Sequence, residues 1–135
     1  MNRILMFAAQ LSVAVVTAVA VSYTTSSYIV HQNEQEFWRN KRIEARAELV
    51  AEYEELVGFS GTPEEASDLL QDHWWTAYSL DNVFDPKIEL NVIAYQGVLQ
   101  LMKDRADTGD KFWTDVYFTP IFTFLDIEMK DQIGL

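Results

Sequence analysis

Apolar residues dominate the first thirty positions of the chain. The run from Ile4 to Val21 contains no charged residue, and a stretch of Ser, Thr and Tyr then leads to Val30. At about 1.5 Å per helical residue, the eighteen residues of this run extend roughly 27 Å, close to the hydrocarbon thickness of a bilayer. The pattern predicts a transmembrane anchor in residues 1–31.

The rest of the chain spaces its apolar residues three and four apart, which is typical of amphipathic helices. Residues 32–57 have this pattern and are expected to form a helix, continuous with the anchor or directly after it. A second helix is expected to begin at Thr62, because an N-cap residue, a first-turn proline and the capping-box residue Glu65 follow in order. It is expected to end near Leu80.

Two further helices are predicted. Asp85 and Pro86 repeat the cap-then-proline signal, and the helix after them carries two apolar stripes, as expected for a helix packed centrally among neighbours. These stripes are Ile88, Val92, Tyr95, Leu99, Met102 and Ala106, and Leu90, Ile93, Ala94, Val98 and Leu101. A last helix is expected from about Lys111, with a kink at Pro120. The alternative for residues 116–124 is a short strand, because aromatic and β-branched residues favour that structure.

These patterns predict an all-α protein. Residues 1–31 would form the transmembrane helix, and residues 32–135 an acidic domain of about four antiparallel helices in a small bundle. The second part is long enough for one small domain and too short for two.

Charge is distributed unevenly along the sequence. The chain carries a formal net charge of -11, and from residue 48 onward eighteen Asp and Glu accompany only five Lys and Arg. Such a surface opposes binding to phosphate, so nucleic acid is not an expected partner. Close to the apolar run, Arg39, Lys41, Arg42 and Arg46 outnumber Arg3. Because Lys and Arg stay preferentially on the cytoplasmic side, we expect the inner (cytoplasmic) membrane with the C-terminal domain in the cytoplasm.

A secretory signal peptide is the alternative interpretation of the first segment. Ala18-Val19-Ala20 fits the small-x-small rule for cleavage, and Arg3 provides a short positively charged start. Residues 1–20 would then be removed, and the helical domain would be periplasmic.

Small residues recur every four positions in the anchor, and a glutamine precedes them. Small residues at this spacing let helix backbones approach closely, so the span is predicted to form homo-oligomers or to dock on a larger membrane protein. Alanine and serine are also common in spans for no such reason. The candidate association residues are Gln10, Ala14, Ala18, Ser22 and Ser26.

Aromatic and basic residues at and after the end of the span are predicted to lie at the membrane interface, where the bilayer itself is the partner. Amphipathic aromatic rings favour the headgroup level, and cations favour anionic lipid surfaces. This set consists of Tyr23, Tyr28, Trp38, Arg39, Lys41 and Arg42.

Residue patterns for catalysis or for cofactor or metal binding were not found. The chain has no cysteine, and neither His31 nor His73 belongs to a Glu-x-x-His element. The spacing of Asp104, Asp107 and Asp110 departs from an EF-hand loop, and His73 is expected at the edge of a core. We therefore expect a non-enzymatic accessory protein that acts through protein-protein contacts at the membrane. The alternative is an exported periplasmic domain that binds a small molecule or modulates an envelope enzyme.

Three segments carry a family resemblance: KRIEARAELVAEYEELV, FDPKIELNVIAYQGVLQLM and FLDIEMKDQIGL. With the preceding span, they resemble a type of uncharacterised bacterial and phage membrane protein. Such proteins have one N-terminal span and a small cytoplasmic helical domain that often ends in a Met-basic-x-x-hydrophobic-Gly tail. Met129, Lys130, Ile133 and Gly134 match that ending. The resemblance implies an architecture and no catalytic residues.

Overall fold

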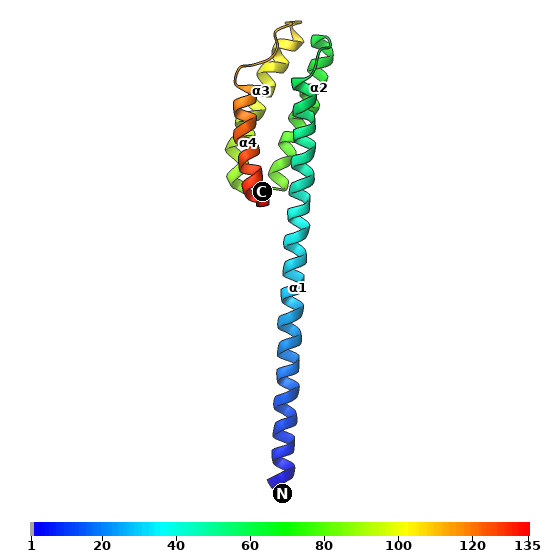
Figure 1. The fold of residues 1–135 in the computed structure, drawn as a ribbon, viewed down its shortest axis with the longest axis vertical. Helices are drawn as coiled ribbons and strands as arrows, with labels where there is room; N and C mark the ends of the chain where they lie inside the picture. Colours follow the sequence, from blue (N-terminus) through cyan, green and yellow to red (C-terminus); the bar gives the residue numbers. More distant parts are fainter. Residues whose placement is uncertain (1) are drawn as a thin grey trace. The chain divides into compact units, whose positions relative to one another are not determined.

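The chain is helical throughout, as a computed structural model shows for the backbone of residues 2–135 and the side chains from Leu5 onward (Figure 1). About 85 % of it is helix, with four α-helices and no strand in the described part, so the all-α class is confirmed. The elements are α1 (Asn2–Val57), α2 (Pro63–Ser79), α3 (Glu89–Asp107) and α4 (Phe118–Ile133), with 3₁₀ turns at Leu80–Asn82 and Pro86–Ile88. The strand alternative for residues 116–124 is wrong, because α4 begins within that segment.

The chain divides into two compact units. The N-terminal unit is Met1–Phe37 and the C-terminal unit is Trp38–Leu135. The sequence placed this boundary after residue 31. Helix α1 is unbroken through both positions, so of the two alternatives that the sequence left open, the second helical segment continues the first.

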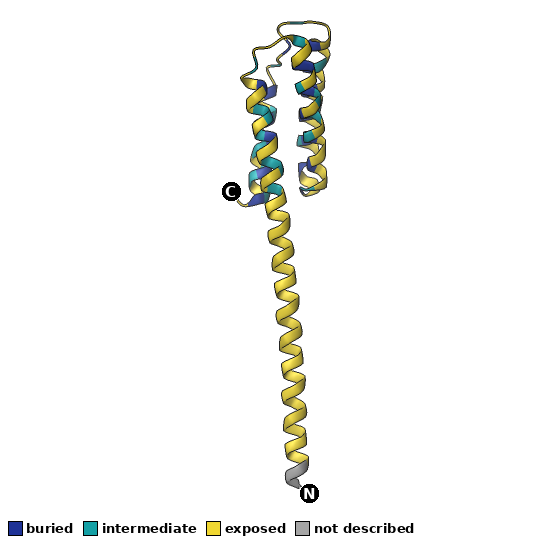
Figure 2. Ribbon diagram, turned by 90° about the vertical axis from the view of Figure 1, so that its right-hand side faces the viewer, coloured by how far each residue is buried: buried dark blue, intermediate teal, exposed yellow. Residues whose placement is uncertain are grey.

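The N-terminal unit is a single apolar helix whose side chains the protein itself does not cover. Every described side chain from Leu5 to Phe37 is exposed, as the uniform colour of this stretch in Figure 2 shows. By length and composition, this helix is suited to cross a membrane, although a signal sequence has the same properties. The hydroxyls of Ser12, Thr17 and Thr24 each donate to the carbonyl four residues earlier, so their polar groups are satisfied within the helix.

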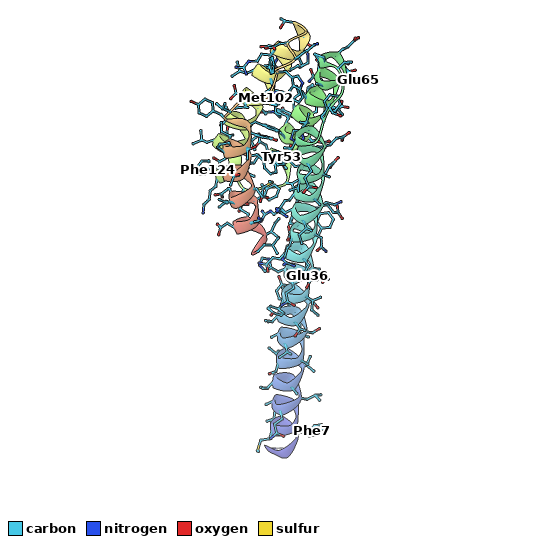
Figure 3. All side chains as sticks on the ribbon, turned by 45° about the horizontal axis from the view of Figure 1, so that its top comes forward. Phe7, Glu36, Tyr53, Glu65, Met102 and Phe124 are labelled. Atoms are coloured by element: carbon cyan, nitrogen blue, oxygen red, sulfur yellow. The ribbon has the colours of Figure 1, made fainter. Side chains whose placement is uncertain are left out.

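The C-terminal unit has one apolar core to which all four α-helices contribute. Helix α1 buries Leu49 and Leu56 in it, and Tyr53, labelled in Figure 3, stacks on Phe122 of α4 with ring centroids 3.7 Å apart. The other buried apolar residues are Ala66, Leu70, Ala77, Leu80, Phe84, Ile88, Val92, Tyr95, Val98, Leu99, Met102, Ala106, Trp113, Phe118, Leu125, Met129 and Ile133.

Helix α2 begins as its sequence predicts. The Thr62 hydroxyl accepts the backbone N–H of Glu65, and the Glu65 carboxylate accepts the backbone N–H of Thr62 at 2.8 Å. These bonds satisfy two N–H groups that a helix start leaves without partners. The same backbone bond to Thr62 lowers the pKa of Glu65.

The starts of α3 and α4 differ from the prediction. Asp85 occupies the N-cap position of the 3₁₀ turn Pro86–Ile88, with Pro86 directly after it, and α3 begins only at Glu89. The Asp85 side chain forms no capping bond, and its carboxylate accepts instead from Arg42 at 2.8 Å. Helix α4 begins at Phe118 rather than near Lys111. The carboxylates of Asp110 and Asp115 each accept the backbone N–H two residues later, which holds this segment in turns.

The predicted kink at Pro120 is wrong for a related reason. Because α4 starts at Phe118, Pro120 lies in the first helical turn, where a backbone N–H has no helical partner to lose. The other end of α4 closes at Gly134, whose φ of 81° is left-handed and favours glycine. In this way the C-terminal tail motif acquires a structural meaning: Met129 and Ile133 are buried, and Gly134 terminates the helix.

The second apolar stripe of α3 was predicted to be buried, and most of it is not. Val98 lies in the core, but Leu90 is 79 % exposed, and Ile93 and Leu101 are each 54 % exposed. Helix α3 is therefore apolar on two opposite sides, of which the C-terminal unit covers one. We call the uncovered side, made of Leu90, Ile93, Ala94, Gly97 and Leu101, the α3 outer face.

Candidate functional site

The predicted association residues all lie on the exposed apolar helix of the N-terminal unit. Gln10, Ala14, Ala18, Ser22 and Ser26 are exposed, and the helix is regular across the whole set. Their side chains are therefore accessible to another helix, and their role in association stays a prediction.

The aromatic residues of the predicted interface set are exposed as well. Tyr23 lies on the outside of α1, and the Tyr28 hydroxyl accepts a hydrogen bond from Gln32 Nε2 at 2.7 Å. Trp38 is the first residue of the C-terminal unit and is partly exposed. Rings in these positions are available to lipid headgroups, and that contact remains a prediction.

The structure gives the basic residues of the interface set protein partners. Arg39 Nε donates to the carbonyl of Ile133 at 3.1 Å, and Arg42 donates to the carbonyls of Val83 and Gln132. Lys41 pairs with Glu44 one helical turn away, at 3.0 Å. The two arginines thus satisfy carbonyls at the end of α4 and beside the 3₁₀ turns, which otherwise lack helical partners.

Arg46 continues this basic row of α1 into the core edge. Its Nε lies 2.7 Å from Asp126 Oδ1, and Lys130 pairs with the other oxygen of that carboxylate at 2.8 Å. Burial raises the pKa of Asp126, but the hydrogen bonds and charges of the two cations outweigh it, so the net shift is downward. The spacing of three and four between Arg39, Arg42 and Arg46 is the sequence signal that these side chains share one helix face.

A buried polar network joins α1, α2 and α3. His73 Nδ1 lies 2.6 Å from Glu52 Oε2, and His73 Nε2 lies 2.6 Å from the hydroxyl of Tyr95. The Thr76 hydroxyl donates to the second oxygen of Glu52 at 2.8 Å. Both His73 and Tyr95 are fully buried, which is deeper than the core-edge position expected for this histidine.

The partners of His73 fit a neutral imidazole. A neutral imidazole with its proton on Nδ1 donates to Glu52 and accepts from Tyr95, so every group is satisfied. Burial lowers the pKa of His73 and outweighs the opposing pull of Glu52, while burial raises the pKa of Tyr95. Both ring nitrogens are occupied inside the core, and the network therefore fixes the packing of three helices.

Open hollows lie where the loops 58–62 and 108–113 meet. One has a volume of about 580 Å³ and is lined by Glu64, Asp68, Asp107 and Lys111 among others, and an adjoining one of about 400 Å³ shares Thr62, Pro63 and Lys111 with it. In this region the Ser67 hydroxyl donates to Asp107, which also pairs with Lys103. Among the side chains that the structure describes, no three acidic or histidine residues are arranged to hold a metal ion.

Comparison of the chain with known protein families, with curated proteins and with solved structures found no match.

Proposed function

We propose that the protein is a single-span, membrane-anchored helical protein that acts through protein-protein contacts at the membrane. One observation carries this proposal. The side chains of the apolar run are exposed from Leu5 through Val30, so the chain provides no cover for them.

A bilayer is the cover that suits this helix best. Removing one Leu, Val or Phe side chain from water is worth about 1.5–3 kcal/mol, and the run contains many of them. The hydroxyls of Ser12, Thr17 and Thr24 already have partners on the helix backbone, which suits hydrocarbon surroundings. The same burial makes the span available for association through the small residues centred on Ala18.

The C-terminal unit is proposed to be a small antiparallel bundle. Its four helical segments are residues 38–57 of α1, α2, α3 and α4, and short connections link each to the next. Helices α2 and α3 pack against each other, α4 packs against α3, and Arg46 ties α4 to α1. This packing supports an interaction domain.

Orientation follows the balance of cations beside the apolar helix. Arg39, Lys41 and Arg42 follow the span closely, which favours the cytoplasm for the C-terminal unit. The positive-inside preference acts on the chain during insertion, before the ion pairs and hydrogen bonds of the folded unit form.

Reporter fusions test this proposal. A reporter active only in the cytoplasm and one active only in the periplasm are fused separately after residue 135, and the membrane fraction is tested for extraction by alkali. We expect alkali-resistant membrane association and cytoplasmic reporter activity. Release by alkali, or activity of the periplasmic reporter, contradicts the anchor or its orientation respectively.

An exported helical domain is the second candidate. Ala18-Val19-Ala20 fits a cleavage site, and the hollow of about 580 Å³ is large enough for a small molecule. The intact mass of the purified protein separates the two candidates. The mass of a polypeptide that begins after Ala20 supports export, and the mass of the uncleaved chain supports the anchor.

A further inference from the structure

The α3 outer face is an apolar strip that the chain leaves uncovered. Leu90, Ile93 and Leu101 are each more than half exposed, on the side of the helix opposite the core residues Val92, Tyr95 and Leu99. Single exposed apolar side chains are normal on a protein surface, whereas a contiguous strip marks a binding surface. The strip runs along one helix for three turns, which is the form that another helix fits.

Gly97 lies in the middle of this face, and no contact within the chain requires a glycine at this position. A Cβ at this position would meet no atom within 4 Å, and its φ is not positive. Glycine inside a helix costs about 1 kcal/mol relative to alanine. The missing side chain does, however, let a second helix backbone come close at the centre of the strip.

The residues of the α3 outer face follow the same spacing whether the helix is read from its N-terminus or from its C-terminus. Leu90, Ala94, Gly97 and Leu101 are separated by four, three and four residues, with small residues at the centre and a leucine at each end. Lys87 lies three residues before Leu90, in the 3₁₀ turn that leads into α3, and Asp104 lies three residues after Leu101; these two residues have opposite charges. Both are exposed, and neither forms an ion pair among the side chains that the structure describes; Asp104 accepts only a hydrogen bond from Gln100.

We propose that the α3 outer face binds the same face of a second copy of this chain, with the two α3 helices antiparallel. Leu90 then lies against Leu101 of the second copy, and Ala94 lies against Gly97 of the second copy. Lys87 meets Asp104 of the second copy, and a two-fold contact makes each of these pairs twice. A parallel pair would instead place Lys87 on Lys87 and Asp104 on Asp104.

This inference concerns the C-terminal unit and does not depend on the proposed membrane anchor. Helix α3 runs in the same direction as residues 38–57 of α1 (Figure 1), so these α1 segments enter the pair from opposite ends. The test uses the full chain in detergent, at physiological salt to screen the acidic surfaces.

Cysteine cross-linking reads the pairing directly, because the chain has no cysteine of its own. Leu90→Cys and Leu101→Cys proteins, carrying different tags, are oxidised separately and after mixing. Facing positions in packed helices come within disulfide range, whereas positions 90 and 90, or 101 and 101, are about 16 Å apart along an antiparallel pair. We expect at least tenfold more cross-linked dimer in the mixture than in either protein alone. Cross-linking of one protein with itself to the same yield, or none in the mixture, overturns the proposal.

Exchange of the charged residues provides a second test of the antiparallel pair, and cysteine reactivity does not affect this test. Lys87→Asp and Asp104→Lys should each weaken dimerisation about tenfold, since each puts like charges together twice. The double variant restores the pairs with reversed sign and should recover the original dissociation constant. Glu54→Lys, on an exposed position of α1, is the matched control and leaves dimerisation within about twofold. All of these proteins carry Ala18→Leu, which is expected to weaken association through the span. If the two single variants dimerise as their Ala18→Leu parent does while helix content is unchanged, antiparallel pairing is excluded.

Discussion

The hydroxyl of Tyr95 lies 2.6 Å from Nε2 of His73, and both side chains are fully buried between α2 and α3. This bond continues to Glu52 on α1 through the other ring nitrogen, so one imidazole connects three helices. Because a buried polar atom without a partner is costly, the stability of the C-terminal unit depends on each member of this network.

Tyr95→Phe should destabilise the C-terminal unit by about 1–3 kcal/mol, since it leaves Nε2 of His73 without its donor. Urea unfolding of the full chain in detergent measures the change. Tyr78→Phe, which removes a hydroxyl from an exposed ring, is the matched control and should change stability by less than about 0.5 kcal/mol. Equal effects of the two variants would mean that the bond to His73 contributes nothing.

Acid should weaken the same network. The pKa of His73 is lowered in the folded protein, so below about pH 6.5 the unfolded chain takes up a proton that the folded protein refuses. Stability from this residue is complete above about pH 6.5 and is lost as the pH falls towards the lowered folded pKa. Urea midpoints between pH 8 and 5 should show this slope, and His73→Gln should remove it. His31 is present in both proteins, so a slope that persists in His73→Gln contradicts this assignment.

The ion pair between Arg46 and Asp126 should matter more than an exposed pair. Its two side chains are 22 % and 15 % exposed, and Arg46→Met would leave Asp126 with Lys130 as its remaining cation. We expect a loss of about 1–2 kcal/mol, between the values typical of surface and buried pairs. Glu44→Gln, which breaks an exposed pair on the same helix, should cost no more than about 0.5 kcal/mol. Unfolding midpoints of the two variants that coincide would contradict this difference.

Local signals predicted much of this fold, and long-range contacts account for most of what they missed. The capping box at Thr62 involves residues three apart, and it was predicted correctly down to its partner Glu65. Helix α4 starts late because the Asp110 and Asp115 side chains accept backbone N–H groups and hold this segment in turns. The residues of the segment are equally compatible with a helix, so its composition did not predict the turns.

The candidate site shows the same limit of sequence reasoning. Glu52 and His73 are 21 residues apart. The periodicity of apolar residues does not predict that these two side chains and Tyr95 form one hydrogen-bonded network. Periodicity identified both apolar stripes of α3. It did not predict that one of them stays exposed, because burial depends on how many other helices pack around α3. In a similar way, Arg39 and Arg42 were predicted to lie at the membrane interface, and their contacts with carbonyls more than 40 residues away were invisible to the sequence.

Ala18→Leu should reduce association through the span, since a larger side chain keeps two helix backbones apart. The measurement is the fraction of detergent-resistant oligomer on gels, which we expect to fall at least threefold. Val16→Leu adds bulk on the opposite side of the same helix and should leave that fraction unchanged. If both variants associate as the parent does, the small-residue face has no role in assembly.

The arginines of α1 also impose an order of events during synthesis. Arg39 bonds to a carbonyl 94 residues later in the chain, and Arg42 to one 90 residues later. At about 5–20 residues per second, translation takes about 5–20 s to supply those partners. During this interval the nascent α1 carries these cations without the α4 carbonyls that accept from them in the folded protein. Under the proposed anchor, the cations are then available for the positive-inside preference that orients the span.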